Sequence, residues 1–86
     1  MGVVALTLRI LPEGPEVDLD RLRDAVRAAL GPRLKKLGAH PLAFGLVALV
    51  ATVVVDDASG AAEQIEATVA GLPGVSTVET TDVSLV

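Results

Sequence analysis

The chain has 86 residues, 51% of them hydrophobic and nearly all of these Ala, Val or Leu, and its formal net charge is −4. This length is enough for one domain and not for two, and the high hydrophobicity argues against intrinsic disorder. The negative charge and the near absence of aromatic side chains argue against nucleic-acid binding, which usually needs basic patches and stacking platforms. Cysteine is absent, which excludes disulfides and thiolate sites and fits a reducing cytosol. We expect one domain spanning residues 1–86, in the cytoplasm, with no direct nucleic-acid partner.

No contact with a membrane is expected either. The first residues lack the basic region of a signal peptide, and Arg9 interrupts their apolar run. The uncharged run 44–55 is shorter than the roughly 20 residues that a membrane-spanning helix requires.

The first half of the chain predicts a strand, a helix and a second strand. Apolar and polar residues alternate over 4–10, as in a strand with one buried face, and the sequence "PEGPE" then ends the pattern. Asp18 is a good helix cap, and the Gly-Pro pair at 31–32 ends the helix that follows. Residues 33–43 predict a weaker second strand. The apolar stripe of the helix consists of Leu19, Leu22, Val26 and Leu30.

The second half repeats this order. Residues 46–55 predict a strand rich in β-branched residues, a helix follows from about Ala61 to Gly71, and a last strand covers about 75–83. An offset of 43 positions relates the halves, since it maps Val4 onto Val47.

The order β-α-β-β-α-β is that of the split ferredoxin-like fold, an α+β architecture. We expect a four-stranded antiparallel sheet with the first and third strands in the centre and both helices on one face. The third predicted strand is apolar at its even and its odd positions, so one apolar set must lie on the open face. An apolar open face favours a partner chain there, including self-association.

No catalytic or metal site is predicted, and no cofactor is expected. His40, the only histidine, precedes Pro41 and is best interpreted as a surface residue. Lys35 and Lys36 on the second strand are typical of an edge protected against strand pairing. These residues indicate that the protein is not an enzyme.

Phe44, the only aromatic residue, has two interpretations. A lone Phe beside an apolar strand usually belongs to the core. Pro41 and Gly45, however, mark the hairpin between the second and third strands, which would place Phe44 at a tip. An aromatic ring at a loop tip is a good anchor for a partner's pocket.

Three segments carry a family resemblance: the opening "MGVVALTLRILPEGPEVDLDRL", the central "PLAFGLVAL" and the closing "GVSTVETTDVSLV". Together they resemble the archaeal translation elongation factor 1-beta family, the guanine nucleotide exchange factors of elongation factor 1-alpha. The resemblance covers nearly the whole chain, and the central segment is its most specific part. It implies a ferredoxin-like fold and promotion of GDP release and GTP loading on the GTPase, without covalent chemistry.

The resemblance also implies where the GTPase is bound. Phe44 matches the family's aromatic residue that enters a pocket on the GTPase. Eukaryotic relatives carry a lysine in the closing segment that reaches the magnesium site, whereas residues 83–86 contain no Lys or Arg. The expected partner-binding residues are Pro41, Ala43, Phe44 and Gly45 in the central segment, and Thr81, Asp82, Ser84 and Leu85 in the closing one.

A second function remains open at this point. The same fold also serves small regulatory or ligand-binding modules, and such a module can dimerise through an open sheet face. Fold alone does not separate these functions.

Overall fold

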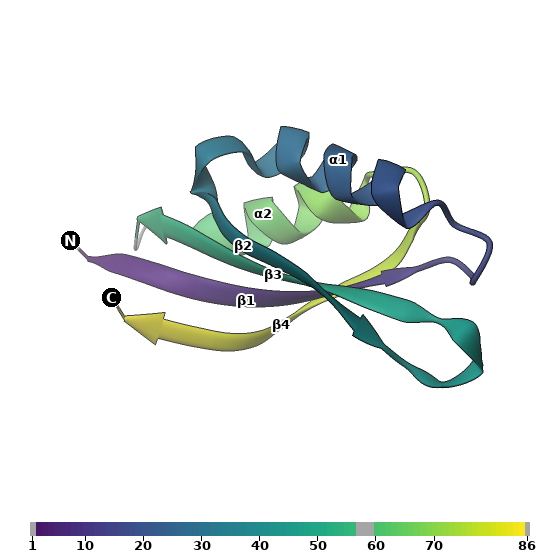
Figure 1. Ribbon diagram of the computed structural model, residues 1–86. Coiled ribbons are helices and arrows are strands. Elements are labelled where there is room, and N and C mark those ends of the chain that lie inside the picture. The colour runs from purple at the N-terminus through teal and green to yellow at the C-terminus, as the bar shows by residue number, and fades with distance from the viewer. Residues whose placement is uncertain (1, 57–59, 86) are drawn as a thin grey trace.

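The computed structural model describes residues 2–56 and 60–85. The elements follow in the order β1 (Val3–Pro12), α1 (Leu19–Leu30), β2 (Leu34–Pro41), β3 (Val47–Asp56), α2 (Ala61–Ala70) and β4 (Val75–Leu85). A short 3₁₀ turn at Gly31–Arg33 precedes β2, and a tight turn at Ala43–Gly45 follows it. The strands form one antiparallel sheet in the order β2-β3-β1-β4, and both helices lie on one face of it (Figure 1). The predicted ferredoxin-like arrangement is confirmed.

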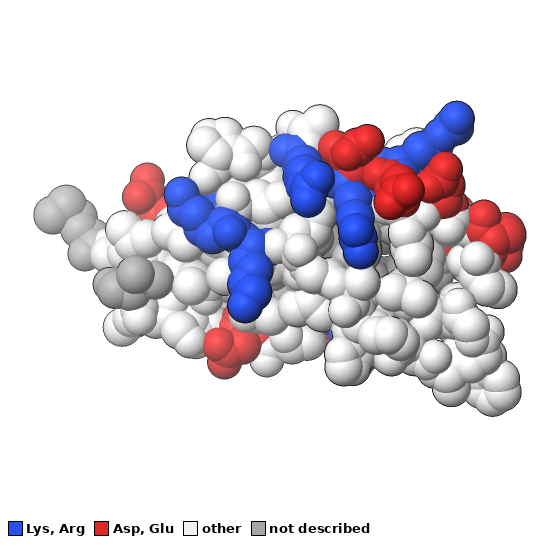
Figure 2. All heavy atoms as spheres, in the orientation of Figure 1, with Lys and Arg blue, Asp and Glu red and all other residues white. Residues whose placement is uncertain are grey.

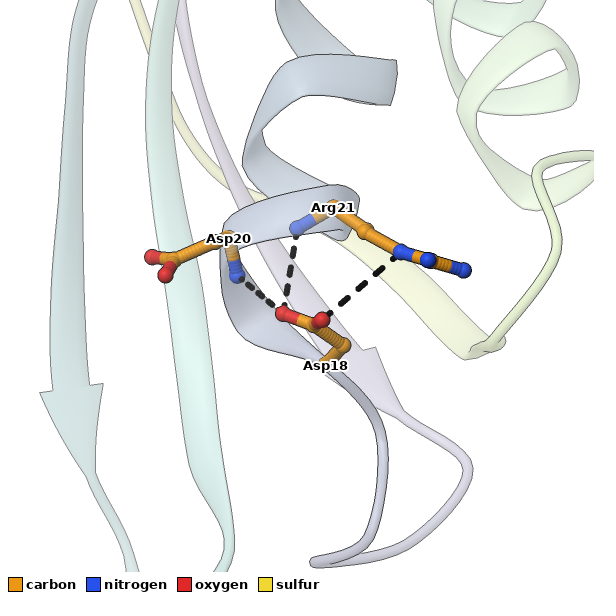
Figure 3. Close-up of polar contacts among 3 residues, drawn as sticks. All are labelled: Asp18, Asp20 and Arg21. Atoms are coloured by element: carbon orange, nitrogen blue, oxygen red, sulfur yellow. Dashed lines mark hydrogen bonds and ion pairs between the residues drawn. The ribbon is translucent and has the colours of Figure 1, made fainter.

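Helix α1 begins where the sequence predicts, because Asp18 caps it (Figure 3). The Oδ1 atom of Asp18 accepts hydrogen bonds from the backbone N–H groups of Asp20 at 3.0 Å and Arg21 at 3.3 Å. A cap of this kind contributes about 1 kcal/mol of stability, because it satisfies N–H groups that have no partner within the helix. The Arg21 Nε atom also lies 3.7 Å from Asp18 Oδ2, an exposed ion pair of little energetic weight.

One aliphatic core lies between the sheet and the helices, and Phe44 is not part of it. Strands β1 and β3 contribute alternate residues to this core, because successive side chains of a strand point to opposite faces. Strand β4 adds only one buried residue to it. The buried members are Val4, Leu6, Leu8 and Ile10 of β1, Leu22, Val26 and Leu30 of α1, Leu49, Ala51, Val53 and Val55 of β3, Ile65 and Val69 of α2, and Val75 of β4.

The open face of the sheet is mixed in character, which corrects the expectation of an apolar face. The alternation of β3 leaves Val50 and Val54 half-buried on this face, with Thr52 between them. On β1, Thr7 and Arg9 share the face, since they pair in register with Thr52 and Val50. Arg9 forms an ion pair with Glu79, its neighbour on β4. Polar neighbours on adjacent strands therefore divide the valines into small areas.

Candidate partner-binding site

The loop between β2 and β3 is a tight hairpin closed by two backbone hydrogen bonds. The Leu42 N–H donates to the Leu46 carbonyl at 2.7 Å, and the Leu46 N–H donates to the Ala43 carbonyl at 3.4 Å. Both residues between Ala43 and Leu46 have positive φ: Phe44 has φ 63° and ψ 28°, and Gly45 has φ 78°. Two positive φ angles are the signature of a type I′ turn, which matches the right-handed twist of the flanking strands.

Phe44 is the residue that this turn holds against its own preference. It is the only non-glycine residue with positive φ in the described part of the chain. The left-handed conformation costs an L-residue roughly 1–2 kcal/mol. Burial does not offset this cost, because the residue is 95% exposed. The sequence interpretation that placed Phe44 at a hairpin tip is confirmed, and the one that placed it in the core is wrong.

The surroundings of Phe44 are apolar and exposed. Pro41, Ala43 and Gly45 are all exposed, and no Asp, Glu, Lys or Arg occurs between Lys36 and Asp56. In Figure 2 the lower right part of the molecule, where Figure 1 draws the hairpin, is correspondingly white, and acidic side chains lie above it. We call residues 41–46 the apolar tip. A uniformly uncharged, protruding tip with one free aromatic ring has the character of a binding anchor.

The β1–α1 loop lies beside the apolar tip. A Cβ atom built on Gly45 would lie 3.8 Å from the Cβ of Pro15, so a side chain at position 45 would touch this loop. No sequence signal indicated this proximity, because it joins residues that are far apart in the chain. Pro15 is exposed and belongs to the same end of the molecule as Phe44.

The second predicted contact region is the last part of β4. The pairing of β4 with β1 shifts by one residue between Thr7 and Leu8, which leaves Thr81 as the extra residue of a β-bulge. The Thr81 hydroxyl donates to the Thr7 carbonyl at 3.2 Å, and the Ser84 hydroxyl donates to Asp82 Oδ2 at 2.9 Å. These contacts order the edge of the sheet without burying it, since Thr81 to Leu85 are all exposed.

The bulge also turns two apolar side chains toward the helix-bearing face. Val83 pairs with the buried Leu6, and Leu85 pairs with the buried Val4, so both point to the same face as the core. They nevertheless remain 60% and 79% exposed. Helix α2 meets β4 at Thr80, whose hydroxyl donates to Glu66 Oε2 at 2.6 Å, before the chain reaches Val83. The prediction from sequence did not include Val83, although its apolar side chain in a polar tail was a signal.

The structure does not bring the two predicted groups of residues together. The hairpin and the C-terminus lie at opposite ends of the sheet (Figure 1). On β1, Val4 lies opposite Leu85, and Ile10 lies opposite Leu49, the last paired residue of β3 before the apolar tip. Val4 and Ile10 are six residues apart, which is about 20 Å along the strand at about 3.3 Å per residue. A partner that contacts both groups must therefore extend along much of the sheet.

The described residues were also compared with the requirements of a metal site and of a membrane-spanning helix. Residues 2–56 and 60–85 contain no cluster of three His, Cys, Asp or Glu side chains that could hold a metal ion. Within the same ranges, neither helix combines the length and the apolar character that crossing a bilayer would demand.

Comparison with known proteins gives this site its context. The family model described as "EF-1 guanine nucleotide exchange domain" matches residues 5–86. Elongation factor 1-beta of Methanothermobacter thermautotrophicus is 45% identical, over 96% of both chains, and that of Methanoculleus marisnigri is 44% identical over the whole of both. Elongation factor 1-beta of Natronomonas pharaonis is 36% identical, over 96% of this chain and 97% of its own. The chain therefore belongs to the EF-1 guanine nucleotide exchange domain family.

Proposed function

We propose that this protein is a guanine nucleotide exchange factor of translation elongation, which promotes GDP release and GTP loading on elongation factor 1-alpha. Residues 1–86 act as one exchange domain in the cytoplasm, and the reaction makes or breaks no covalent bond. The observation that carries the proposal is Phe44, held fully exposed at the apolar tip in a conformation that costs energy. In a member of an exchange family, that arrangement is explained by a pocket on the partner that receives the ring.

The thermodynamic requirement for exchange is a difference in affinity. The factor must bind the nucleotide-free GTPase more tightly than the nucleotide-bound form, because a ligand shifts an equilibrium only by its differential affinity. By linkage, bound nucleotide weakens the binding of the factor by the same ratio. The protein therefore needs a strong anchor and a second contact that conflicts with nucleotide or its magnesium ion.

We assign the role of anchor to the apolar tip. Insertion of Phe44 into an apolar pocket removes a large hydrophobic area from water, and the tight turn fixes the ring's direction beforehand. Little conformational entropy is then lost on binding, because the hairpin is already ordered by its two backbone hydrogen bonds. Pro41, Ala43 and Gly45 provide the uncharged surface around the ring.

We assign the second contact to the end of β4, with Thr81, Asp82, Ser84 and Leu85. No Lys or Arg occurs in residues 81–86, so this segment has no basic side chain with which to displace magnesium. Magnesium needs near-ideal octahedral geometry, and a small shift of the loops that hold it is enough to weaken its binding. In this protein the contacts of β4 and the apolar tip would shift those loops by packing.

The test is release of a fluorescent GDP analogue from elongation factor 1-alpha, followed by stopped flow with excess unlabelled GTP. We expect micromolar protein to accelerate release, with a rate that saturates as its concentration rises. Elongation factor 1-alpha of Methanothermobacter thermautotrophicus is a suitable substrate, and the relative from that organism is the positive control. An unchanged release rate, alongside acceleration by the positive control, would refute the proposed function.

A further inference from the structure

The open face of the sheet carries opposite charges at its two edges. Neither α1 nor α2 covers this face (Figure 1). Strand pairing places Lys36 of β2, Thr52 of β3, Thr7 of β1 and Asp82 of β4 side by side across it. We call these four residues the charged row. One end of the charged row is positive, the other end is negative, and two threonines lie between them.

The two charges of the charged row are not neutralised within one chain. No ion pair among residues 2–56 and 60–85 includes Lys36 or Asp82. Both side chains are exposed, and the Asp82 carboxylate accepts a hydrogen bond from the neutral Ser84 hydroxyl. They lie on the two outer strands of the sheet, three strand spacings or about 14 Å apart. An opposite charge for each of them must therefore come from another molecule.

A second copy of this chain supplies both opposite charges. If two open faces stack about a twofold axis that runs along the strands, between β1 and β3, the β2 edge of one copy lies over the β4 edge of the other. Lys36 then faces Asp82 of the second copy, and this pair forms twice because the contact is symmetric. An axis along the charged row would instead place each residue over its own copy, and like charges would repel. The charges therefore select the first axis.

The next row of the open face fits the same arrangement. It consists of Gly38, Val50, Arg9 and Glu79. Gly38 would lie opposite Glu79 of the second copy and leaves room for it, since a Cβ atom built on Gly38 meets nothing within 4 Å. Val50 would lie opposite Arg9 of the second copy, whose aliphatic stem can cover it. Arg9 and Glu79 already form an ion pair within each chain, so covering them leaves neither charge unpaired.

The open face is large enough for a weak but specific dimer. Four strands about 4.8 Å apart, paired over about eight residues, give a face of about 500 Å². Two such faces together bury about 1,000 Å², which is the lower limit for specific contacts between proteins. The mixed apolar and polar composition of the face is typical of interfaces between proteins that also exist separately.

We propose that the protein forms a twofold-symmetric homodimer through the open face of its sheet, held by two ion pairs between Lys36 and Asp82 of the other copy. The sequence-based expectation of self-association assumed an apolar face, whereas this proposal rests on the complementary charges of the two edges. It does not depend on nucleotide exchange, because the dimer contains no GTPase and leaves the apolar tip uncovered. The failure of either proposal therefore leaves the other standing.

The first test is sedimentation equilibrium of the full chain alone. We expect the average mass to rise from that of one chain toward that of two as the concentration increases, with a dissociation constant of about 100 µM. The dimer should weaken when salt is raised from about 0.1 to about 0.5 M, because exposed ion pairs are screened. The mass of one chain at all concentrations up to about ten times the expected dissociation constant would overturn the proposal.

Charge reversal tests the two ion pairs. Lys36→Glu and Asp82→Lys should each weaken the dimer at least about tenfold, because each variant opposes like charges twice. The double variant K36E/D82K should return to within about threefold of the parent protein, since it exchanges the two charges. Arg27→Glu is the matched control: it changes the net charge as Lys36→Glu does, but at an exposed position on α1, away from the open face. Equal weakening by Lys36→Glu and Arg27→Glu, or no recovery in a folded double variant, would contradict the proposal.

Cysteine cross-linking tests the direction of the axis. The chain contains no cysteine, so each introduced thiol is unique. The proposed axis places Thr7 opposite Thr52 of the second copy. A mixture of the Thr7→Cys and Thr52→Cys proteins should therefore form the mixed disulfide faster than either protein forms a disulfide with itself. Faster self-linking would place each residue over its own copy and would refute the proposed arrangement.

Discussion

The apolar tip and the end of β4 are both exposed, but different forces hold them in place. At the tip, a two-residue turn fixes Phe44 in a left-handed conformation that its side chain disfavours. At the end of β4, pairing with β1 fixes the backbone in an ordinary extended form. Val83 and Leu85 are exposed there because the helices do not extend over them. Phe44 is exposed because the turn holds it away from the sheet, whereas Val83 and Leu85 are exposed because no helix covers them.

The strain at Phe44 makes the apolar tip stronger support for a binding role than the exposure at the end of β4. A strained, uncovered Phe44 lowers stability and adds no packing to the core, which supports the proposal that it serves to bind the partner. Val83 and Leu85 carry no such strain. Their exposure alone is weaker support for a contact, since single apolar residues on a surface are normal. We therefore rank the tip above the end of β4 as the main anchor.

The largest expected effect tests whether the end of β4 truly lies outside the core. Leu6 and Val83 are direct neighbours across β1 and β4, but Leu6 is 2% exposed and Val83 is 60% exposed. Leu6→Ala should lower the free energy of unfolding by about 3 kcal/mol, because it leaves a cavity. Val83→Ala should change it by less than about 0.5 kcal/mol. Urea denaturation measures both, and similar losses in the two variants would mean that Val83 is covered.

The next effect concerns the tip as an anchor. Phe44→Ala should reduce the apparent affinity for nucleotide-free elongation factor 1-alpha by about 30-fold, or about 2 kcal/mol, as expected for a binding hot spot. The concentration dependence of GDP release gives this value. Val3→Ala, a truncation of an exposed apolar residue at the other end of the sheet, is the control and should leave exchange unchanged. A Phe44→Ala variant with full affinity would remove the anchor from the mechanism.

A smaller effect is expected at the end of β4. Leu85→Ser should weaken exchange by about fivefold, roughly 1 kcal/mol, because it removes an apolar contact at a secondary site. Its thermal stability should remain within the range of neutral surface substitutions. Should Leu85→Ser reduce exchange more than Phe44→Ala does, the ranking of the two regions would be reversed.

The smallest effect isolates the strain itself. Phe44→Asn should raise the free energy of unfolding by about 0.5–1 kcal/mol, because Asn followed by Gly is the preferred pair for a type I′ turn. The same variant should lose affinity for the GTPase as fully as Phe44→Ala does. A gain in stability together with a loss of exchange is the expected signature, measured by urea denaturation and GDP release. A loss of stability would show that the ring supports the fold after all.

Much of the fold follows from short-range pattern in the chain. Period-two alternation predicts β1, and helical spacing after a capping Asp18 predicts α1, because both depend on residues a few positions apart. The β-branched composition of residues 46–55 and the Gly and Pro residues around α2 locate the second half in the same way. Strand ends were less well predicted: β1 continues to Pro12 and β4 to Leu85, because pairing with a neighbouring strand extends a strand beyond its own local signal.

The sequence predicted which residues form the candidate site, but it did not predict how these residues are arranged in space. The central and closing segments were assigned from family resemblance, and the structure places them at opposite ends of the sheet. Val83 was missed because its direction depends on the bulge at Thr81, which resets the alternation along β4. The proximity of Pro15 to Gly45 was missed because nothing in either segment encodes the other.

The sequence by itself determined the order of the elements, the aliphatic character of the core and the family. These depend on local periodicity, composition and matching segments. Only the tertiary structure decided that Phe44 is exposed, that the open face is mixed and that the apolar tip and the end of β4 lie at opposite ends of the sheet. These features depend on strand register, bulges and the extent of helix cover, which arise from contacts between distant parts of the chain. A sequence pattern lists the side chains, and the packing of the sheet against its helices decides which of them a partner can reach.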